Sequence, residues 1–310
     1  MDFSQFLALD WISMLQAALR TSTPIVLAAL GGILAERSGV INIALEGIML
    51  AAAYGGFVVG IVTGSTWIGL VGALAAGALI AALHAVLCIR FRTDQVISGV
   101  VINIFAAGMT GYFYRQFDIN ADVSTLSDVN IPLLQNIPVL GPIFFQQRIL
   151  TYVMLALVIV VHIAVFHTAW GLRTRAVGER PRAADTVGIK VNRLRYLNVI
   201  LSGMLAGLGG AYLTLGSVGR FTPNMTGGRG FIGLAAMIFG NWTPLGALGA
   251  SLLFTIPDAI AVKLQILGVQ IPSQIITLLP YVLTIIVLAG FGRRSRAPEA
   301  LGKAYETQSR

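Results

Sequence analysis

The stretch ALGGILAERSGVINIALEG, residues 29–47, interrupts a strongly apolar region with glycines and with the polar side chains of Glu36, Arg37, Asn42 and Glu46. In a membrane, backbone groups that lack an intrahelical partner cannot face lipid, because each would cost several kcal/mol. An interrupted segment must therefore be enclosed by protein or line a wet cavity. We predict a broken membrane helix near 36–47.

The composition outside this stretch is typical of an integral membrane protein. Hydrophobic residues make up 56% of the 310 residues and charged residues only 11%, against about 25% charged in an average soluble domain. Apolar runs of about 18 or more residues are expected to cross the bilayer as helices. Such runs lie at 40–62, 66–89, 95–117, 149–169, 195–217 and 272–291, with less regular candidates at 11–35 and 227–262. The predicted fold class is all-α, a polytopic helical membrane protein with one domain over 1–310.

The basic residues set the predicted orientation. The loop 171–195 holds seven of them against two acids, and the tail 292–310 holds five. By the positive-inside rule both segments are cytoplasmic, which places the loop 118–147 and the N-terminus outside. An external N-terminus and a cytoplasmic C-terminus require an odd number of crossings. We therefore predict about nine passages, with a short or broken one at 227–246, in a bacterial plasma membrane.

Interrupted segments in both halves of a membrane protein point to a translocation path near the bilayer midplane. We expect the breaks at 36–47 and 227–246 to converge beside a central cavity. The candidate path residues are Asn42, Glu46, Asn103 and Asn241. For Asn42, Glu46 and Asn103 a structural role is the alternative, and it is favoured. Glu46 could pair with Arg37 or cap a half-helix, and the two asparagines could hydrogen-bond neighbouring helices together.

The charged run RAVGERPRAADTVGIKVNRLR, residues 175–195, predicts a two-turn helix outside the membrane after a turn at Gly178. Pro181 suits the first helical turn, and Gly188 suits the residue that ends the helix. Ala183, Ala184 and Val187 are predicted to share one stripe. A helix of this kind suits a groove on a cytoplasmic partner, and a solvated basic loop that serves only topology is the alternative.

Three stretches of the chain resemble permease subunits of bacterial ABC importers in the branched-chain amino acid and ribose permease superfamily. They are LAALGGILAERSGVINIALEGIMLAAAYGG (27–56), RAVGERPRAADTVGIKVNRLRYLNVILSGMLAGLGGAYL (175–213) and GRGFIGLAAMIFGNWTPLGALGASLLF (228–254). Within that superfamily the likeness is greatest to nucleoside (simple-sugar) permeases. It covers most of the chain and is weakest at 1–20, 118–147 and after 296.

The resemblance implies a transport subunit and not an enzyme, without a cofactor or metal, and with ATP hydrolysis on a separate ATPase. The other implied partners are a second, related permease chain and an external solute-binding lipoprotein. Nucleosides are the implied cargo, and sugars or other small polar solutes are the alternative. In the superfamily, the loop equivalent to 178–188 is a coupling helix that inserts into the ATPase. The implied coupling residues are Gly178, Glu179, Pro181, Arg182, Ala183, Ala184, Asp185 and Gly188.

A secondary transporter driven by an ion gradient is the main alternative from another class. It would need a titratable relay or a cation cage in the membrane core, and Glu46 is the only candidate for one. A channel or an intramembrane enzyme would need a repeated filter, a metal cluster or a nucleophile with its base. The net charge of +8 lies where topology requires it, so we expect the bilayer, and not nucleic acid, as the surrounding partner.

Overall fold

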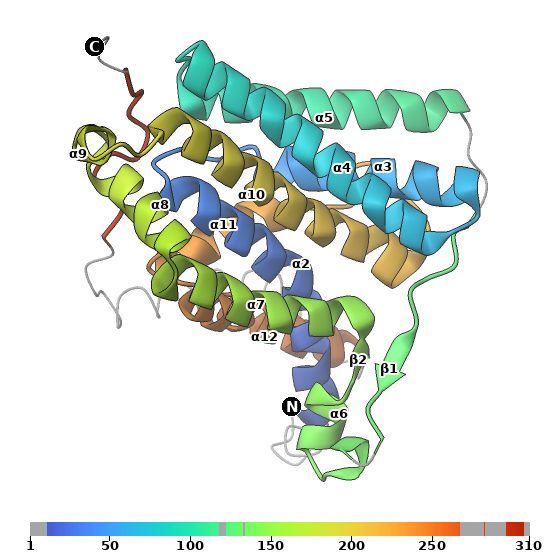
Figure 1. Cartoon of the computed structure of the whole chain (residues 1–310). Coiled ribbons are helices and arrows are strands. Elements are labelled where there is room, and N and C mark those ends of the chain that lie inside the picture. The colour runs from blue at the N-terminus through green and yellow to red at the C-terminus, as the bar shows by residue number, and fades with distance from the viewer. Residues whose placement is uncertain (1–10, 118–121, 133, 267–281, 283–295, 307–310) are drawn as a thin grey trace.

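The computed structural model describes residues 11–117, 122–132, 134–266, 282 and 296–306 (Figure 1). This part of the chain is almost entirely helical, as the sequence predicts. Outside the loop 118–147, its elements are α2 (Trp11–Arg37), α3 (Leu45–Thr63), α4 (Thr66–Ala85), the π-helical turn η1 (Val86–Arg90), α5 (Gln95–Phe117), α7 (Ile149–His167), α8 (Ala169–Glu179), α9 (Pro181–Thr186), α10 (Val191–Leu213), the π-helical turn η3 (Thr214–Val218), α11 (Arg229–Phe239) and α12 (Pro244–Ile266).

Seven of the described helices are long and apolar enough to cross a membrane, and α11 is a shorter apolar helix. The region 227–262 is thus split into α11 and α12, as predicted, by four non-helical residues. The predicted run 272–291 lies outside the described residues apart from one position. The total of nine passages therefore stays a prediction.

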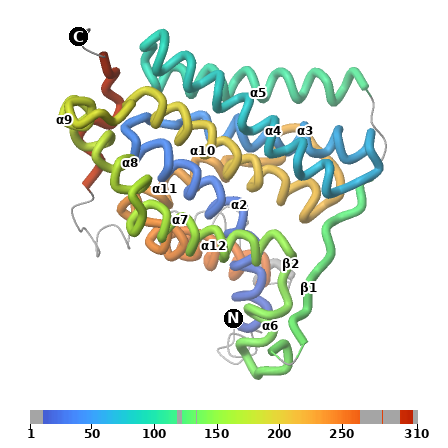
Figure 2. Tube along the Cα trace, viewed as in Figure 1, coloured from blue at the N-terminus to red at the C-terminus, as the bar shows by residue number. Residues whose placement is uncertain are grey.

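The loop predicted at 118–147 contains a small structured unit that the sequence did not reveal. Its elements are β1 (Asp128–Asn130), the 3-10 turn η2 (Leu134–Asn136), α6 (Leu140–Phe144) and β2 (Gln146–Arg148). The two strands pair antiparallel, with Asp128 opposite Arg148. This unit projects from the helical bundle at the end where α2 begins (Figure 2).

The helices form a bundle with α2 and α10 at its centre. In each of these two helices, 83% of the most apolar window is buried, whereas the corresponding share is 28% for α4, α5 and α12. Glycines let α4 approach its neighbours closely: a Cβ on Gly203 would lie 2.4 Å from the carbonyl oxygen of Gly77, and one on Gly69 would lie 2.7 Å from that of Gly56. The outer helices leave apolar side chains exposed around the bundle, as lipid contact requires.

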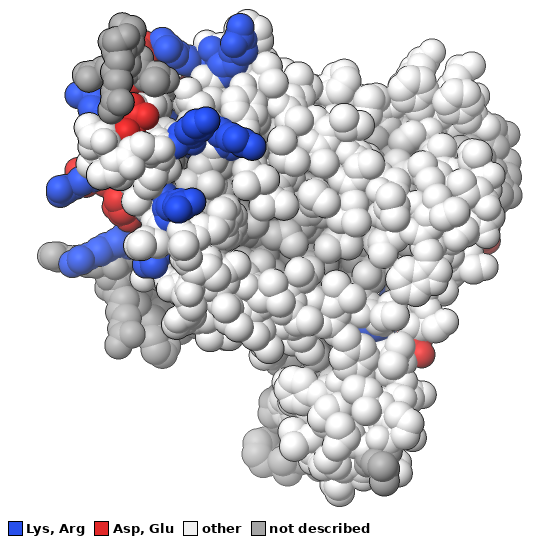
Figure 3. Space-filling model, viewed as in Figure 1, with Lys and Arg blue, Asp and Glu red and all other residues white. Residues whose placement is uncertain are grey.

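The charged side chains gather at one end of the molecule. Figure 3 shows Lys and Arg side chains around α8, α9 and the start of α10, while the middle of the same face carries almost none. An apolar surface with basic side chains at one end is typical of a protein whose helices span a bilayer.

Candidate functional site

The first break consists of residues 38–44, between the end of α2 at Arg37 and the start of α3 at Leu45. Side chains from neighbouring helices bind its backbone. The N–H of Ile41 donates to Oε1 of Gln95 at 2.7 Å, and the carbonyl oxygen of Ile41 lies 2.9 Å from Nε2 of His84. Because these groups replace missing helical hydrogen bonds, the chain can be non-helical here while most of its residues stay buried.

Asn103 and Asn42 hold the same break from two sides. The Asn103 amide accepts from the N–H of Gly47 at 2.7 Å and donates to the carbonyl oxygen of Ile43 at 3.0 Å. Asn42 is fully buried, and its Nδ2 donates to the hydroxyl of Ser202 on α10 at 2.9 Å. Both amides therefore make the stapling contacts that the structural alternative describes.

The second break begins with the non-helical residues before α11, and Glu46 joins it to the first break. The Glu46 carboxylate accepts hydrogen bonds from the N–H groups of Gly228 at 2.8 Å and Gly230 at 2.6 Å. Gly228 has φ +83°, and a Cβ on Gly230 would lie 2.6 Å from the backbone of Glu46, so both positions require glycine. Of the two structural roles considered for Glu46, the contacts are those of a half-helix cap, where a negative charge is favourable.

The two breaks also meet at the other end of α11. The buried Glu36 carboxylate accepts from the indole N–H of Trp242 at 2.6 Å and from the backbone N–H of Asn42. The Arg37 guanidinium donates to the carbonyl oxygens of Trp242 and Asn241. Two carboxylates that flank the first break, Glu36 at the end of α2 and Glu46 at the start of α3, thus hold the two ends of α11.

Asn241 lies apart from the other three candidate path residues. It follows the C-terminal end of α11, about 16 Å along the helix axis from the end that Glu46 caps. It is exposed, its φ is +53°, and its side chain accepts from the backbone N–H of Arg296. The structure therefore groups Asn42, Glu46 and Asn103 around the first break and places Asn241 at the basic end of the molecule.

The predicted extramembrane helix is present as α9, with Pro181 at its first position and Gly188 in the left-handed conformation, φ +84°, shortly after its end. The predicted turn at Gly178 is wrong. Gly178 and Glu179 form the last turn of α8, and the chain turns at Arg180 instead. Gly178 packs against the α2 terminus, where a Cβ would lie 2.1 Å from the carbonyl oxygen of Arg37, so this helical position requires glycine.

The prediction that Ala183, Ala184 and Val187 share one stripe on α9 is wrong for Ala184. Ala184 is 4% exposed and packs with Val177, Val191 and Tyr305 of the same chain. Ala183 and Val187 are exposed, as are Arg182 and Gly188. Residues 183 and 187 are four apart and share a helix face, whereas residue 184 points about 100° away from residue 183. The outer face of α9 is therefore small, apolar and bordered by charge.

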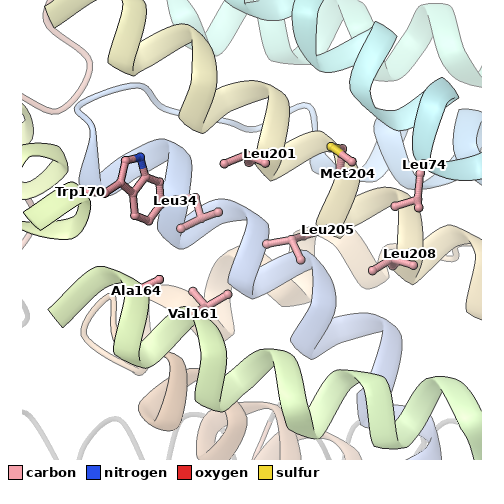
Figure 4. A pocket seen from close by; sticks show the side chains of 9 residues that line it. All are labelled: Leu34, Leu74, Val161, Ala164, Trp170, Leu201, Met204, Leu205 and Leu208. Atoms are coloured by element: carbon pink, nitrogen blue, oxygen red, sulfur yellow. The ribbon is translucent and has the colours of Figure 1, made fainter. Parts of the chain in front are cut away.

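A pocket of about 380 Å³ opens between α2, α4, α7, α8 and α10 (Figure 4). Its walls are wholly apolar: Leu34, Leu74, Val161, Ala164, Trp170, Leu201, Met204, Leu205 and Leu208. A pocket for a polar solute needs convergent polar groups, so this one does not serve as a solute site.

Several residues of the site were missed by sequence reasoning. In the sequence, Glu36 belongs to the polar interruption and Arg195 to the basic loop, but the structure buries both. Trp242 lies within the predicted break at 227–246, and its local sequence does not indicate the contact with Glu36. A signal for Glu36 was present, because an acid inside an apolar helix needs a nearby donor. The donor lies more than 200 residues away in the sequence, so no local pattern identifies it.

Two broken helices that meet inside an all-helical bundle, with a charged helix outside it, define a multi-pass membrane transport subunit. The chain belongs to the family described as the branched-chain amino acid transport system / permease component, whose model matches residues 14–288. Membership in this family decides against the ion-gradient alternative, and it assigns ATP hydrolysis to a separate ATPase chain.

Three relatives that are 34–41% identical match nearly the whole chain. The guanosine ABC transporter permease protein NupQ of Bacillus subtilis is 40% identical over 98% of both chains. The nucleoside ABC transporter permease protein NupC of Lactococcus lactis is 41% identical over 92% of this chain and 93% of its own. The "Putative glucose ABC transporter permease protein TsgC13" of Haloferax volcanii is 34% identical over 95% of this chain and 98% of its own.

Each of these three organisms has a second permease that matches more weakly. These permeases are 25–26% identical to this chain, and the match covers 66–81% of their length: NupP, NupB and TsgB13. The fold is also that of the solved structure "An inward-facing conformation of a putative metal-chelate type ABC transporter", with a TM-score of 0.50, 16% identity and coverage of 93% of this chain and 88% of that one.

Proposed function

We propose that the chain is a permease subunit of an ABC importer for nucleosides. The observation that carries the proposal is its similarity, at 40–41% identity over nearly the full length, to permeases named for guanosine and nucleosides. The paired breaks support it, because they supply polar groups inside an apolar bundle without exposing unpaired backbone to lipid.

The proposed orientation in the bacterial plasma membrane has the N-terminus outside and the C-terminus in the cytoplasm. The concentration of basic side chains around α8 and α9 supports it (Figure 3), since basic loops stay on the cytoplasmic side. The hairpin of β1 and β2 would then face the outside, where an extracytoplasmic solute-binding lipoprotein delivers the solute.

The proposed second permease is a related chain and not a second copy. Two permeases occur in each of the three organisms, one similar to this chain over its whole length and one longer and more distant. We infer that this chain plays the part of the shorter member of such a pair. Purification of the complex through an affinity tag on this chain tests the pairing, and a second, related permease should copurify. Recovery of two copies of this chain without the related permease would contradict it.

The proposed path follows the meeting of the two breaks. Asn42, Glu46 and Asn103 hold the wall of the path in place, and Asn241 lies at its cytoplasmic end. The Glu46 carboxylate and the Asn103 amide each make two hydrogen bonds to backbone groups. Asn42 makes one, to Ser202, and its buried Oδ1 has no hydrogen-bond partner in the described part of the chain. Their proposed role is therefore to position the broken segments, so that solute contact depends on surfaces completed by the second permease.

The proposed coupling element is α9 together with the residues around it, from Gly178 to Gly188. Its outer face offers Ala183 and Val187, and Val187 is 75% exposed. A short, small-residue face of this kind fits a groove on the ATPase. Pro181, Gly178 and Gly188 shape the helix, while Glu179, Arg182 and Asp185 provide polar groups around the face.

Uptake by the complete complex in proteoliposomes tests the cargo. With ATP inside and the external binding protein outside, radiolabelled guanosine should accumulate and unlabelled nucleosides should compete. The sugar alternative is favoured by the 34% identity to the glucose-named permease, and it predicts accumulation of glucose with no competition by nucleosides. That second result would overturn the nucleoside assignment while leaving the permease assignment in place.

Val187→Arg tests the coupling element. On a solvated loop this change should alter stability by no more than about 0.5 kcal/mol, but in a packed interface a larger charged side chain is excluded. We expect loss of ATPase copurification and of uptake, with normal membrane insertion. Val187→Thr keeps the shape and is the matched control. Normal ATPase recovery with Val187→Arg would show that α9 is not the coupling element.

A further inference from the structure

The described tail, residues 296–306, crosses the basic end of the molecule and touches several elements that are distant in sequence. The N–H of Ala300 donates to the carbonyl oxygen of Gly178 on α8 at 2.9 Å, and the N–H of Gly302 donates to that of Gly39 in the first break at 3.2 Å. Two backbone hydrogen bonds within three residues thus join the proposed coupling element to the first break.

Arg195 of α10 binds both the tail and the first break. It is 2% exposed, and its Nε donates to the carbonyl oxygen of Ser38 at 3.1 Å while its Nη1 donates to that of Lys303 at 3.0 Å. One guanidinium therefore holds the first break and the tail together. Its Nη2 is buried and has no hydrogen-bond partner among the described residues. Because burying a charged group in this way is costly, we infer that Arg195 has a positional purpose beyond marking a basic loop.

Tyr305 attaches the far end of the tail to α9. Its ring is 8% exposed and packs with Val177, Ala184 and Val191. Its hydroxyl is hydrogen-bonded to Asp185 of α9. Partial burial, followed by the contact with Asp185, raises the pKa of Tyr305 above its usual range, so the phenol stays neutral and remains a donor at physiological pH.

The remaining contacts extend the crossing to two more loops. The N–H of Arg296 donates to the side chain of Asn241, between α11 and α12. Glu306 pairs with Arg92, between α4 and α5. Exposed ion pairs contribute little by themselves, so the backbone hydrogen bonds, Arg195 and Tyr305 are the contacts that hold the tail in place.

We propose that residues 296–306 form a strap that binds α8 and α9 to the first break and thereby carries movement of the coupling element to the translocation path. The inference rests on the proposed coupling role of α9. Without the strap, α9 could still bind the ATPase, because its outer face is on the side away from Tyr305. A force applied there would reach the first break only through the α8 terminus and through α10, whose Ser202 binds Asn42.

The test compares transport with ATP hydrolysis in the reconstituted complex. Tyr305→Ala removes the ring, Arg195→Lys can no longer reach both carbonyl oxygens, and Lys303→Ala is the matched control, because its side chain is exposed and Arg195 binds only its backbone. We expect Tyr305→Ala and Arg195→Lys to lower the amount of solute moved per ATP hydrolysed at least fivefold, with normal ATPase copurification. Lys303→Ala should behave as the unaltered protein.

A cross-link separates transmission from simple stability. In a Cys88→Ala background, Glu179→Cys and Glu299→Cys can be joined by a short bis-maleimide, since the N–H of Glu299 lies 3.2 Å from the Glu179 carboxylate. Joining them in the Tyr305→Ala variant should restore the transport-to-hydrolysis ratio. An unchanged ratio in uncross-linked Tyr305→Ala, or a cross-link that blocks transport, would overturn the strap. Failure of the coupling role itself would show separately, as normal ATPase recovery with Val187→Arg.

Discussion

The two breaks differ in how their backbones are held. The first, residues 38–44, is bound by side chains of α4, α5 and α10, including His84, Asn103 and Arg195. The second, on either side of α11, is closed mostly by local turns such as those from Asn224 to Gly227 and from Gly240 to Thr243. Its principal long-range anchors near α11 are the side chains of Glu36, Arg37 and Glu46, which flank the first break.

This difference separates a part that moves only as a rigid unit from a part that can change its shape. Displacing the first break would leave buried donors and acceptors on several helices unpaired, each costing about 1–3 kcal/mol. Displacing α11 breaks few long-range hydrogen bonds, mainly those to Glu36, Arg37 and Glu46. We therefore expect α11 and its flanking loops to change position during transport while the first break keeps its shape.

Glu46→Ala should have the largest effect, because it removes the acceptor for two backbone N–H groups at the start of α11. Hydrogen bonds to charged groups contribute about 1.5–3 kcal/mol each, so uptake should fall by more than about tenfold. Glu46→Gln retains an acceptor oxygen, so its uptake should lie between that of Glu46→Ala and that of the unaltered protein. The exposed Asp128→Asn is the control, and uptake by Glu46→Ala equal to that of the control would remove the anchor from the account.

Asn103→Leu should come next, since it leaves the N–H of Gly47 and the carbonyl oxygen of Ile43 without their partner. The expected loss of unfolding free energy is about 2–3 kcal/mol, seen as a lower thermal unfolding temperature in detergent. Asn42→Leu removes only the bond to Ser202 and should cost less, while still reducing uptake. The reverse order would show that the first break depends on α10 more than on α5.

Trp242→Phe should have a smaller effect, about 1–2 kcal/mol, because it removes the indole donor to Glu36 and little else. A double-mutant cycle with Glu36→Leu, which removes the acceptor, measures the coupling between the two side chains in the thermal stability of the purified complex. We expect the second substitution to cost less in the presence of the first. Strict additivity would mean that this contact does not hold the end of α11.

Removing the ion pair between Arg220 and Asp122, near the start of the second break, should have the smallest effect. The exposed Arg220 donates to Asp122 at 2.7 Å and lowers the pKa of that carboxyl group. A lowered folded-state pKa stabilises the protein above the ordinary value of about 3.9, and this contribution is lost as pH falls through the lowered pKa. Thermal unfolding of Arg220→Gln between pH 7 and pH 3 should therefore show a shallower acid decline. An unchanged slope would contradict a role for the pair.

Much of this architecture could be predicted from the sequence, because its signals are local. Apolar runs locate the helices to within a few residues: the prediction 95–117 coincides with α5, and Pro181 and Gly188 delimit α9. Both breaks were predicted from glycines and polar residues inside apolar segments, since backbone that is interrupted within a membrane must be enclosed.

What the sequence did not reveal depends on contacts between distant residues. The position of Ala184 against Tyr305, the burial of Arg195 and the pairing of Glu36 with Trp242 require the folded chain. Gly178 illustrates the same limit. Glycine is common in turns, but this glycine lies in a helix, and it is required there because only a residue without a side chain fits beside the carbonyl oxygen of Arg37.

Hydrogen–deuterium exchange of the assembled complex tests the contrast between the two breaks most directly, because it reports backbone opening residue by residue. The account predicts that peptides covering 38–47 stay protected both without nucleotide and during ATP turnover. Peptides covering 220–230 and 240–244 should exchange faster, and their exchange should change with nucleotide. Equal exchange in the two breaks, or a nucleotide-dependent opening confined to 38–47, would contradict it.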